Sequence, residues 1–579
     1  MYKKISIALF LLLIAFQSIY TKVITTYGLE EALREVEPGD IIELKSGTYR
    51  AIQYQFKNGT MKQRITIRPA PNAEVYFEGP TSSYDCVFEA TGLQYVTFEG
   101  PINIVGANCG FKFLKSYSVN ITDIRFFDIK GQAIVISGTD YVLYKNQIYG
   151  CVTDNRYTAK TRTSGWSKCV SVSGGCCHTI KNNTISFSFG ESLYLANVSS
   201  TVVAHNEITN GFNANIYINS SKHIDIDGNI LRVNSTEYDN KYGAACGIAM
   251  TNINNYVVRS INITNNIIIG TRIGIHYFMQ DVKGGYEFIS ISHNTLWNVH
   301  VTPIWFENPE KDHSYGVGSE LKNNFIYFEG AKELEPKKFW KIDYNLYYNT
   351  NEVPSIYSDT TSKAAKDLPL NTVFNKINGC SDYFNLDLKP ECLRPSKEPG
   401  ELQLFQSGTA ALKEKVLEDI AYCRRNSDSP SIGAFEFTEG CSGGLLPPTD
   451  TPITTDAPIT DAPIRDYDVR FNITYCTEEY HLMRIVGSFC NFHVASAEPM
   501  IQDKKCHWTY TFKDGTTKEF RYKFVDSVEG SAYKVENDPF RMFKGKELAK
   551  LISKSIVGKY EDCDYSISGD IVTLVCTWR

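Results

Sequence analysis

Two nearby residues carry the side chains that a reaction on an acidic sugar would need. Arg272 holds a permanent positive charge, and His276 can take up or release a proton near neutral pH. A cation that neutralises a uronate carboxylate and a base that removes the C5 proton are sufficient for β-elimination. Lys168 adds positive charge, as do Lys160 and Arg162. We therefore predict His276, Arg272 and Lys168 as catalytic candidates; alternatively, the arginine is a solvated turn residue and the histidine a surface or stacking histidine.

Aromatic residues recur at one position of successive β-rich segments. In each segment an aliphatic residue should point inward, and the next residue should then point outward, because side chains alternate along a strand. The first outward set is Ser171, Tyr194, Tyr217, Ala249, His276 and Trp305, and the set two positions later is Ser173, Ala196, Asn219, Thr251, Phe278 and Glu307. Aromatic rings can stack on sugar faces. We predict as substrate-binding residues Tyr194, Tyr217, Trp305, Phe278 and Glu307; alternatively, strand propensity alone explains the aromatics.

Acidic residues are scarce in these two sets, which contain one acid, Glu307. Calcium requires several oxygen ligands, and glycoside hydrolysis generally uses a pair of carboxylates. The sequence therefore predicts no metal site and no cofactor; Ca²⁺ is the alternative, although no acid cluster supports it. Whether the chain is an enzyme stays open; an active protein would be similar to a polysaccharide lyase.

A recurring asparagine identifies the architecture that must position these side chains. The asparagines are Asn146, Asn183, Asn206, Asn229, Asn266, Asn294 and Asn324. Spacings of 23, 23, 37, 28 and 30 residues from Asn183 onward indicate one coil per repeat, with insertions in particular turns. A coil of about 22 residues cannot bury its inward face alone, but stacked coils share a core and pair their strands in parallel. In such a stack the asparagines can adopt left-handed backbone geometry and hydrogen bond up and down the column.

The pattern resembles the pectate-lyase-like right-handed parallel β-helix superfamily, in which an asparagine ladder occupies the turn between the second and third strands. The start is similar to the entry of such helices, with a capping helix at 28–34 and a first strand at 41–44. Segments 343–348, 383–386 and 431–436 are similar to the closing part. The resemblance implies an all-β fold over 23–440 and places residues 151–167 and 232–246 beside the first-strand face, where the superfamily binds substrate. It does not imply one activity, because the scaffold hosts lyases, hydrolases, epimerases and catalytically silent adhesins.

The remaining parts of the chain differ in composition. Residues 1–22 are predicted to be a signal peptide, because a basic start precedes an apolar run at 5–16 that is too short to span a bilayer. Residues 441–465 are Thr/Pro-rich and predict a stiff linker. Residues 466–579 predict a small cysteine-containing α+β module, with strands at 506–512 and 519–524 joined by a turn and a helix at 544–555.

Cysteines and glycosylation sequons favour a secreted, extracellular glycoprotein. The chain has 16 cysteines, which favour disulfides in an oxidising compartment, although their connectivity cannot be deduced. The predicted glycosylation sites are Asn58, Asn120, Asn182, Asn197, Asn219, Asn234, Asn262 and Asn472. The net charge of −6 and the lack of a basic block argue against a nucleic-acid partner. No later stretch is apolar enough to span a membrane.

Taken together, the sequence predicts a monomeric extracellular protein that binds an acidic polysaccharide along its first-strand face, with β-elimination as the candidate reaction. The alternative is a non-catalytic adhesin or structural glycoprotein of a cell wall or matrix. The long turn insertions favour the first interpretation, and the missing acid cluster favours the second.

Overall fold

The computed structural model describes two compact units, Met1–Thr449 and Asp450–Arg579. In the first unit the described residues are 21–53, 57–79, 86–155, 167–233, 245–253, 256–280, 284–307, 316–327, 340–348, 363–365, 389–394, 416, 418–426 and 430–436. In the second unit the backbone of the strands is described. The predicted signal residues 1–20, the predicted linker and segment 383–386 lie outside the described residues, as do Lys160 and Arg162.

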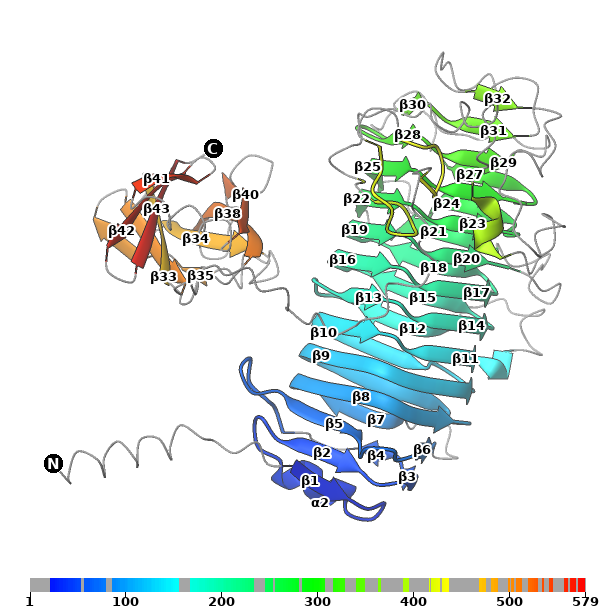
Figure 1. Ribbon diagram of the computed structural model, residues 1–579, viewed down its shortest axis with the longest axis vertical. Coiled ribbons are helices and arrows are strands. Elements are labelled where there is room, and N and C mark those ends of the chain that lie inside the picture. The colour runs from blue at the N-terminus through cyan, green and yellow to red at the C-terminus, as the bar shows by residue number, and fades with distance from the viewer. Residues whose placement is uncertain are drawn as a thin grey trace. The chain divides into compact units, whose positions relative to one another are not determined.

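The first unit is a right-handed parallel β-helix, as predicted (Figure 1). Each coil contributes one strand to each of three parallel sheets, so a strand pairs with the strands one coil before and one coil after it. For example, Leu193 pairs in register with Val170 below and with Ile216 above. This pairing satisfies the backbone groups of every internal strand.

Short strands build the three sheets. The first sheet contains β4 (Ile52–Gln53), β7 (Cys86–Thr91), β12 (Lys168–Ser173), β15 (Glu191–Ala196), β18 (Ala214–Asn219), β21 (Cys246–Asn252), β24 (Ile273–Met279) and β27 (Thr302–Phe306). The second contains β1 (Thr21–Ile24), β2 (Ile41–Leu44), β5 (Ile65–Pro69), β13 (Thr179–Lys181), β16 (Ser199–Ala204), β19 (Lys222–Asp227), β22 (Val257–Thr264), β25 (Gly285–Ser292), β28 (Glu320–Lys322) and β30 (Lys341–Asp343). The third contains β3 (Gly47–Arg50), β6 (Val75–Glu78), β11 (Gln147–Cys151), β14 (Thr184–Ser188), β17 (Glu207–Gly211), β20 (Ile230–Arg232), β23 (Ile267–Ile269), β26 (Thr295–Trp297), β29 (Phe325–Tyr327), β31 (Leu346–Tyr348) and β32 (Lys363–Ala365). Three longer strands continue around corners between sheets: β8 (Gln94–Val105), β9 (Cys109–Ile129) and β10 (Ile134–Tyr144).

The inward side chains of all three sheets form one continuous core. Val170, Leu193 and Ile216 of the first sheet are buried in it, as the alternation predicted. Aromatic rings fill the wider early coils, where Phe88, Phe98 and Phe111 pack with ring centroids 5.1–5.2 Å apart. Burial of this core is the main driving force for stacking the coils.

The asparagine ladder is present and continues one step further than predicted. The amide Nδ2 of Asn183 donates to Oδ1 of Asn206, and Asn206 donates in the same way to Asn229, both at 2.9 Å. The same bond joins Asn146 to the bottom of the series and Asn345 to its top, at 2.9 and 3.0 Å. The ladder residues are Asn146, Asn183, Asn206, Asn229, Asn266, Asn294, Asn324 and Asn345, all buried.

The predicted left-handed geometry lies one residue before each ladder asparagine. His205 precedes Asn206 with φ 53°, and Asn182 precedes Asn183 with φ 58°, whereas the ladder residues do not have positive φ. The left-handed residue turns the chain, which leaves the following asparagine free to direct its amide along the column. Our assignment of this geometry to the ladder residues was therefore wrong by one position.

The entry to the solenoid begins earlier than the sequence suggested. The short helix α2 (Leu29–Glu35) confirms the predicted cap, and it buries Leu29, Ala32 and Leu33. A strand before it, β1, pairs Thr21 with Ile41 and Lys22 with Ile42. The predicted signal segment, residues 1–22, therefore overlaps the first half of β1.

A closing segment, residues 416, 418–426 and 430–436, packs against the late coils at the second turn. The guanidinium of Arg425 donates to Asn265 Oδ1 at 2.6 Å and lies 3.3 Å from the Glu436 carboxylate. Ala434 N–H donates to Thr295 Oγ1 at 3.0 Å, and Phe435 joins a buried cluster with Trp297. The closing segment thus connects several coils along the stack. A short 3₁₀ helix at Pro390–Leu393 contributes Cys392 and Leu393 to the same cluster.

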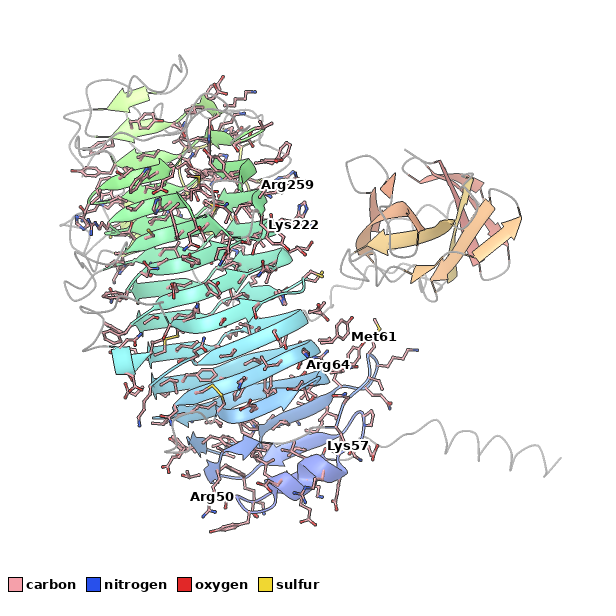
Figure 2. All side chains as sticks on the ribbon, turned by 180° about the vertical axis from the view of Figure 1, so that it is seen from behind. Arg50, Lys57, Met61, Arg64, Lys222 and Arg259 are labelled. Atoms are coloured by element: carbon pink, nitrogen blue, oxygen red, sulfur yellow. A yellow bond between two sulfur atoms is a disulfide. The ribbon has the colours of Figure 1, made fainter. Side chains whose placement is uncertain are left out.

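Outward positions of the second sheet carry polar side chains. Lys222 and Arg259, labelled in Figure 2, are register neighbours on β19 and β22. Arg259 is paired with Glu287 of the next coil at 3.1 Å. Glu287 therefore compensates the charge of Arg259, whereas the exposed Lys222 adds one positive charge to this side of the solenoid.

The second unit contains two sheets. One is formed by β33 (Asp468–Thr474), β36 (Ile501–Lys504), β37 (His507–Phe512), β41 (Val557–Tyr560), β42 (Cys563–Ser568) and β43 (Ile571–Thr577). The other is formed by β34 (His481–Gly487), β35 (Glu498–Pro499), β38 (Glu519–Val528), β39 (Lys534–Val535) and β40 (Arg541–Lys544). The two strands predicted to be joined by a turn, β37 and β38, therefore belong to different sheets. The predicted helix at 544–555 lies outside the described residues except for Lys544, which ends β40.

Candidate functional site

The predicted outward columns of the first sheet are in register. Backbone pairing joins Ser171, Tyr194, Tyr217, Ala249, His276 and Trp305 in that order, one residue per coil. It also joins Ser173, Ala196, Asn219, Thr251 and Phe278, and the N–H of Glu307 bonds to the carbonyl of Tyr277 just beyond the last pair. We call this outer face of the first sheet the wall.

A third column, which the sequence analysis missed, lies at the strand starts of the wall. Its residues are Lys168, Glu191, Ala214, Cys246, Ile273 and Thr302. Strict alternation from Leu193 would turn Glu191 inward, but Ala214, Cys246 and Ile273 cluster with Tyr217 and Ala249 on the wall. The strand start bends, so residues three apart share a face there. The available signals were Glu191, three positions before Tyr194, and Cys246, three positions before Ala249.

The large side chains of the wall pack on one another in a continuous row. Lys168 Nζ lies 4.7 Å from the Tyr194 ring centroid, and Tyr194 stacks on Tyr217 at 5.4 Å. Phe278 leans over the small Ala249 and bridges Tyr217 at 5.7 Å and His276 at 5.4 Å. His276 stacks on Trp305 at 4.6 Å. We call these six residues, Lys168, Tyr194, Tyr217, Phe278, His276 and Trp305, the wall row.

This stacking determines which ring surfaces of the wall are accessible to a sugar. Tyr217 is 7% exposed and His276 6% exposed, whereas Tyr194, Phe278 and Trp305 are half-buried. Tyr194 lies between the Lys168 ammonium on one side and the Tyr217 ring on the other. Its ring faces are therefore occupied by the protein, and ring edges are what it can offer. Tyr194 and Tyr217, both predicted to bind substrate, therefore offer a sugar less ring face than their outward positions suggested.

His276 is enclosed by protein groups at both ring nitrogens. Its Nδ1 is 3.9 Å from Cys246 Sγ, and its Nε2 is 3.7 Å from Glu307 Oε1. Burial raises the pKa of the Cys246 thiol to about 12, an effect that the nearby Arg272 charge partly opposes. The cysteine is therefore a neutral thiol at physiological pH.

Glu307 is held as a carboxylate at the strand-end edge of the wall. The His276 imidazole lowers the pKa of Glu307, partial burial opposes this, and the Met279 N–H, which donates to Oε2 at 2.9 Å, lowers it further. The side chain remains 35% exposed. Part of its acceptor capacity therefore faces solvent.

The three catalytic candidates do not form one centre. Arg272 directly precedes β24 and lies in the same coil as His276, half-buried. Lys168 lies four coils away, through Glu191, Ala214 and Cys246 to Ile273. At about 4.8 Å per coil this is about 19 Å. Lys168 cannot act on the same sugar atom as His276, and of the three predicted residues only Arg272 and His276 lie in one coil.

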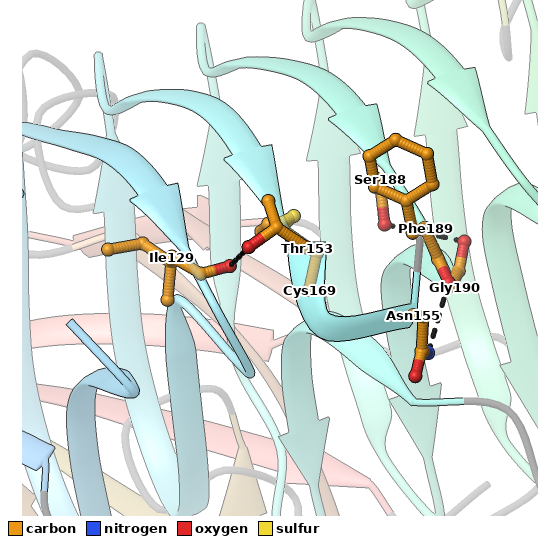
Figure 3. Close-up of a disulfide and its surroundings, with 8 residues drawn as sticks. Ile129, Thr153, Asn155, Cys169, Ser188, Phe189 and Gly190 are labelled. Carbon is orange, nitrogen blue, oxygen red and sulfur yellow. Dashed lines mark hydrogen bonds between the residues drawn. A yellow bond between two sulfur atoms is a disulfide. The ribbon is translucent and has the colours of Figure 1, made fainter. Parts of the chain in front are cut away.

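The insertion between β11 and β12 starts from a fixed base. A disulfide joins Cys151 to Cys169 and so connects the end of β11 to β12 (Figure 3). Thr153 Oγ1 donates to the Ile129 carbonyl at 3.3 Å, and Asn155 Nδ2 donates to the Phe189 carbonyl at 3.2 Å. Residues 156–166 and 234–244 of the two predicted insertions lie outside the described residues, and their ends lie between the third and first sheets as predicted.

Solved structures that resemble parts of the chain include polysaccharide lyases. An alginate lyase from Paenibacillus sp. str. FPU-7 is 15% identical, with a TM-score of 0.40, over 50% of this chain and 99% of that one. A pectate lyase is 16% identical, with a TM-score of 0.40, over 73% and 98%. A rhamnogalacturonan lyase is 12% identical, with a TM-score of 0.41, over 66% and 98%. Similarity at this level does not extend to substrate or activity. No family model and no curated relative matches the chain. The three parallel sheets and the ladder in the second turn themselves identify a pectate-lyase-like parallel β-helix.

The predicted glycosylation sites differ in their surroundings. Asn58, Asn197 and Asn262 are exposed, and Asn120 and Asn182 are half-buried. Asn219 is 6% exposed, and its Nδ2 donates to the Tyr194 hydroxyl at 3.0 Å. A glycan on that nitrogen would break the bond and enter the packed wall, which argues against the prediction at Asn219. Asn234 lies outside the described residues, as does the side chain of Asn472 on β33.

Among the described residues, no three His, Cys, Asp or Glu side chains are grouped to hold a metal ion. Within the same residues, no helix is long and apolar enough to cross a membrane. Disulfides Cys86–Cys109 and Cys151–Cys169 are present, and Cys392 and Cys423 are also disulfide-bonded.

Proposed function

We propose that this protein is an extracellular carbohydrate-binding β-helix that holds an acidic polysaccharide along its wall. The observation that carries the proposal is the combination of half-buried aromatics, Tyr194, Phe278 and Trp305, with cations Lys168 and Arg272 along one edge of the same face. The aromatics supply apolar contact area, and the cations attract carboxylates. The wall from Lys168 to the Trp305 coil extends over about 24 Å at 4.8 Å per coil, so several sugars can contact it.

Trp305 is the part of the wall row best placed for stacking. Its ring is half-buried, and His276 occupies one of its faces. Its strand, β27, ends the first sheet in the described part of the chain, so no further wall residue is described above it. The exposed part of the Trp305 ring is the surface that we propose for sugar stacking, and Tyr217 supports the row from below.

Binding is tested with purified full-length protein and a panel of uronate polysaccharides. Trp305→Ala should weaken binding about tenfold, because an aromatic contact contributes up to about 1.5 kcal/mol. Lys168→Met should weaken it up to about fivefold at low salt. The matched controls are Tyr149→Ala, an exposed aromatic on the third sheet, and Lys222→Met on the second sheet, and both should bind normally. Equal losses in the variants and the controls would contradict the wall as the binding face.

Cleavage by β-elimination is the second candidate, favoured by Arg272 and His276 sharing one coil. Enclosure of both His276 nitrogens opposes it, because the base must reach the C5 proton. Ultraviolet absorbance of an unsaturated product, lost in His276→Gln while binding persists, would support a lyase. Binding without product would support a non-catalytic adhesin.

Separate observations support the proposal of secretion. Disulfides close β7 to β9 and β11 to β12, and the sequons at Asn58, Asn197 and Asn262 are exposed. We propose that the solenoid is a monomer and that the second unit is a separate binding or anchoring module. Sedimentation of the secreted, disulfide-intact protein tests the monomer, since a dimeric mass would contradict it.

A further inference from the structure

The two edges of the wall differ in charge: the strand-start edge carries two cations and one buried acid, Glu191, and the strand-end edge carries one acid, Glu307. Lys168 and Arg272 lie at the strand-start edge, and the positive charge of Arg272 acts on Cys246 in that column. The strand-end edge carries Ser173, Asn219, Thr251 and, at its upper end, Glu307. A ligand lying along the stack therefore has Lys168, Arg272 and the buried Glu191 on one side and hydroxyl, amide and carboxylate groups on the other.

The carboxylate of Glu307 is fixed where a ligand would pass. Met279 N–H holds Oε2 at 2.9 Å, and His276 Nε2 faces Oε1 at 3.7 Å. Trp305 lies two residues earlier on the same outer face, and Phe278 is the neighbour of Glu307 one coil below. A sugar stacked on Trp305 thus has this carboxylate as its polar neighbour.

An ionised carboxylate accepts hydrogen bonds from sugar hydroxyls and repels other carboxylates. In an extended polysaccharide with two sugars per turn, the substituents of successive sugars point to opposite sides of the chain. A homopolyuronate would direct every second carboxylate to the strand-end edge. A chain in which uronates alternate with uncharged sugars can direct all its carboxylates to the edge of Lys168 and Arg272.

We propose that Glu307 is a specificity-determining residue that selects polysaccharides with alternating uronate and uncharged sugars over homopolyuronates. This inference rests on the proposed function, because it requires a polysaccharide on the wall. A carboxylate held about 5 Å from Glu307 in a water-like dielectric would weaken binding about fourfold, and salt would reduce the effect.

The test compares hyaluronan, which alternates glucuronate with N-acetylglucosamine, and polygalacturonate, at low and high salt. Calorimetry on full-length protein should give tighter binding to hyaluronan. Glu307→Gln, which keeps an acceptor for Met279 N–H, should tighten polygalacturonate binding about fourfold and change hyaluronan binding by less than about twofold. The matched control, Glu78→Gln on the exposed face of β6, should change neither.

The outcomes distinguish a failure of the selectivity inference from a failure of the proposed function. If both polysaccharides bind, Trp305→Ala weakens both and Glu307→Gln leaves their ratio unchanged, the wall binds polysaccharide and the selectivity inference is wrong. If Trp305→Ala has no effect on either ligand, or if neither ligand binds, the proposed function itself fails. A fourfold gain that persists unchanged at high salt would also overturn the electrostatic explanation.

Discussion

Replacing one internal residue of the ladder should destabilise the solenoid by several kcal/mol. Asn206 is 1% exposed, and its amide makes four hydrogen bonds. Nδ2 donates to the Ile180 carbonyl and to Asn229 Oδ1, and Oδ1 accepts from the backbone N–H and the Nδ2 of Asn183, all at 2.9 Å. In Asn206→Ala the Asn183 N–H and the Ile180 carbonyl lose these bonds inside the core. Each buried group without a partner costs about 1–3 kcal/mol, so we expect a loss of about 2–6 kcal/mol.

The loss is measured by urea denaturation followed by far-ultraviolet circular dichroism, with hydrogen exchange at the Asn183 amide as a local readout. Asn262→Ala is the control: this asparagine is exposed on the second sheet and bonds Asp225 at 2.7 Å, so its loss should cost less than about 1 kcal/mol. Both proteins are produced without glycans, because Asn262 is part of a sequon. A ladder variant no less stable than the control, with unchanged exchange at Asn183, would refute the reasoning.

Other predictions concern the closing segment, protonation and processing. Arg425→Ala should lower the free energy of unfolding by about 3–5 kcal/mol and expose the closing segment to protease, because it leaves the Glu436 carboxylate buried without its cation. Arg425→Met together with Glu436→Gln should recover part of that stability. An Arg425→Ala variant as stable as the native protein would exclude a structural role for the pair. Burial lowers the pKa of His178 and of His205 to about 4, so below pH 6.5 the unfolded chain binds more protons than the folded chain. The stability of the fold should therefore decrease as the pH drops from about 6.5 to about 4. Asp227 and Asp419 partly offset this decrease, because burial raises the pKa of their carboxyl groups. Denaturation at several pH values measures the slope, which His178→Gln should flatten. Glycopeptide mass spectrometry should find glycans at Asn58, Asn197 and Asn262 and none at Asn219, and sequencing of the secreted N-terminus should start at or before Thr21.

The sequence predicted the stack well because the ladder depends on a repeating local pattern. The asparagines from Asn146 to Asn324 occupy one turn per coil, and the aliphatic residues beside them alternate with period two. Asn345 was recognisable only as part of a closing segment, because the interval of 21 residues after Asn324 follows coils of other lengths. The strand β1 was hidden because its residues adjoin the apolar run of the predicted signal.

The candidate site was predicted less completely, for reasons that lie in packing. Alternation gave the columns of Tyr194 and Phe278 correctly, but it could not show that the strand starts bend and bring Ala214 and Cys246 onto the wall. It also could not show that neighbouring rings stack on one another and leave their edges outward. The four coils between Lys168 and Ile273, the neighbour of Arg272, are visible only after the register is known.

By itself, the sequence determined the period of the coil, the order of the strands and the outward columns of the first sheet, because these depend on residue type and spacing along the chain. Tertiary structure alone decided what those columns can do. The contacts of Tyr194 with Lys168 and Tyr217, and of His276 with Trp305, Cys246 and Glu307, join residues from different coils. The distances between these residues, and the burial and ionisation of their side chains, depend on how coils of unequal length stack. No local sequence pattern specifies that stacking.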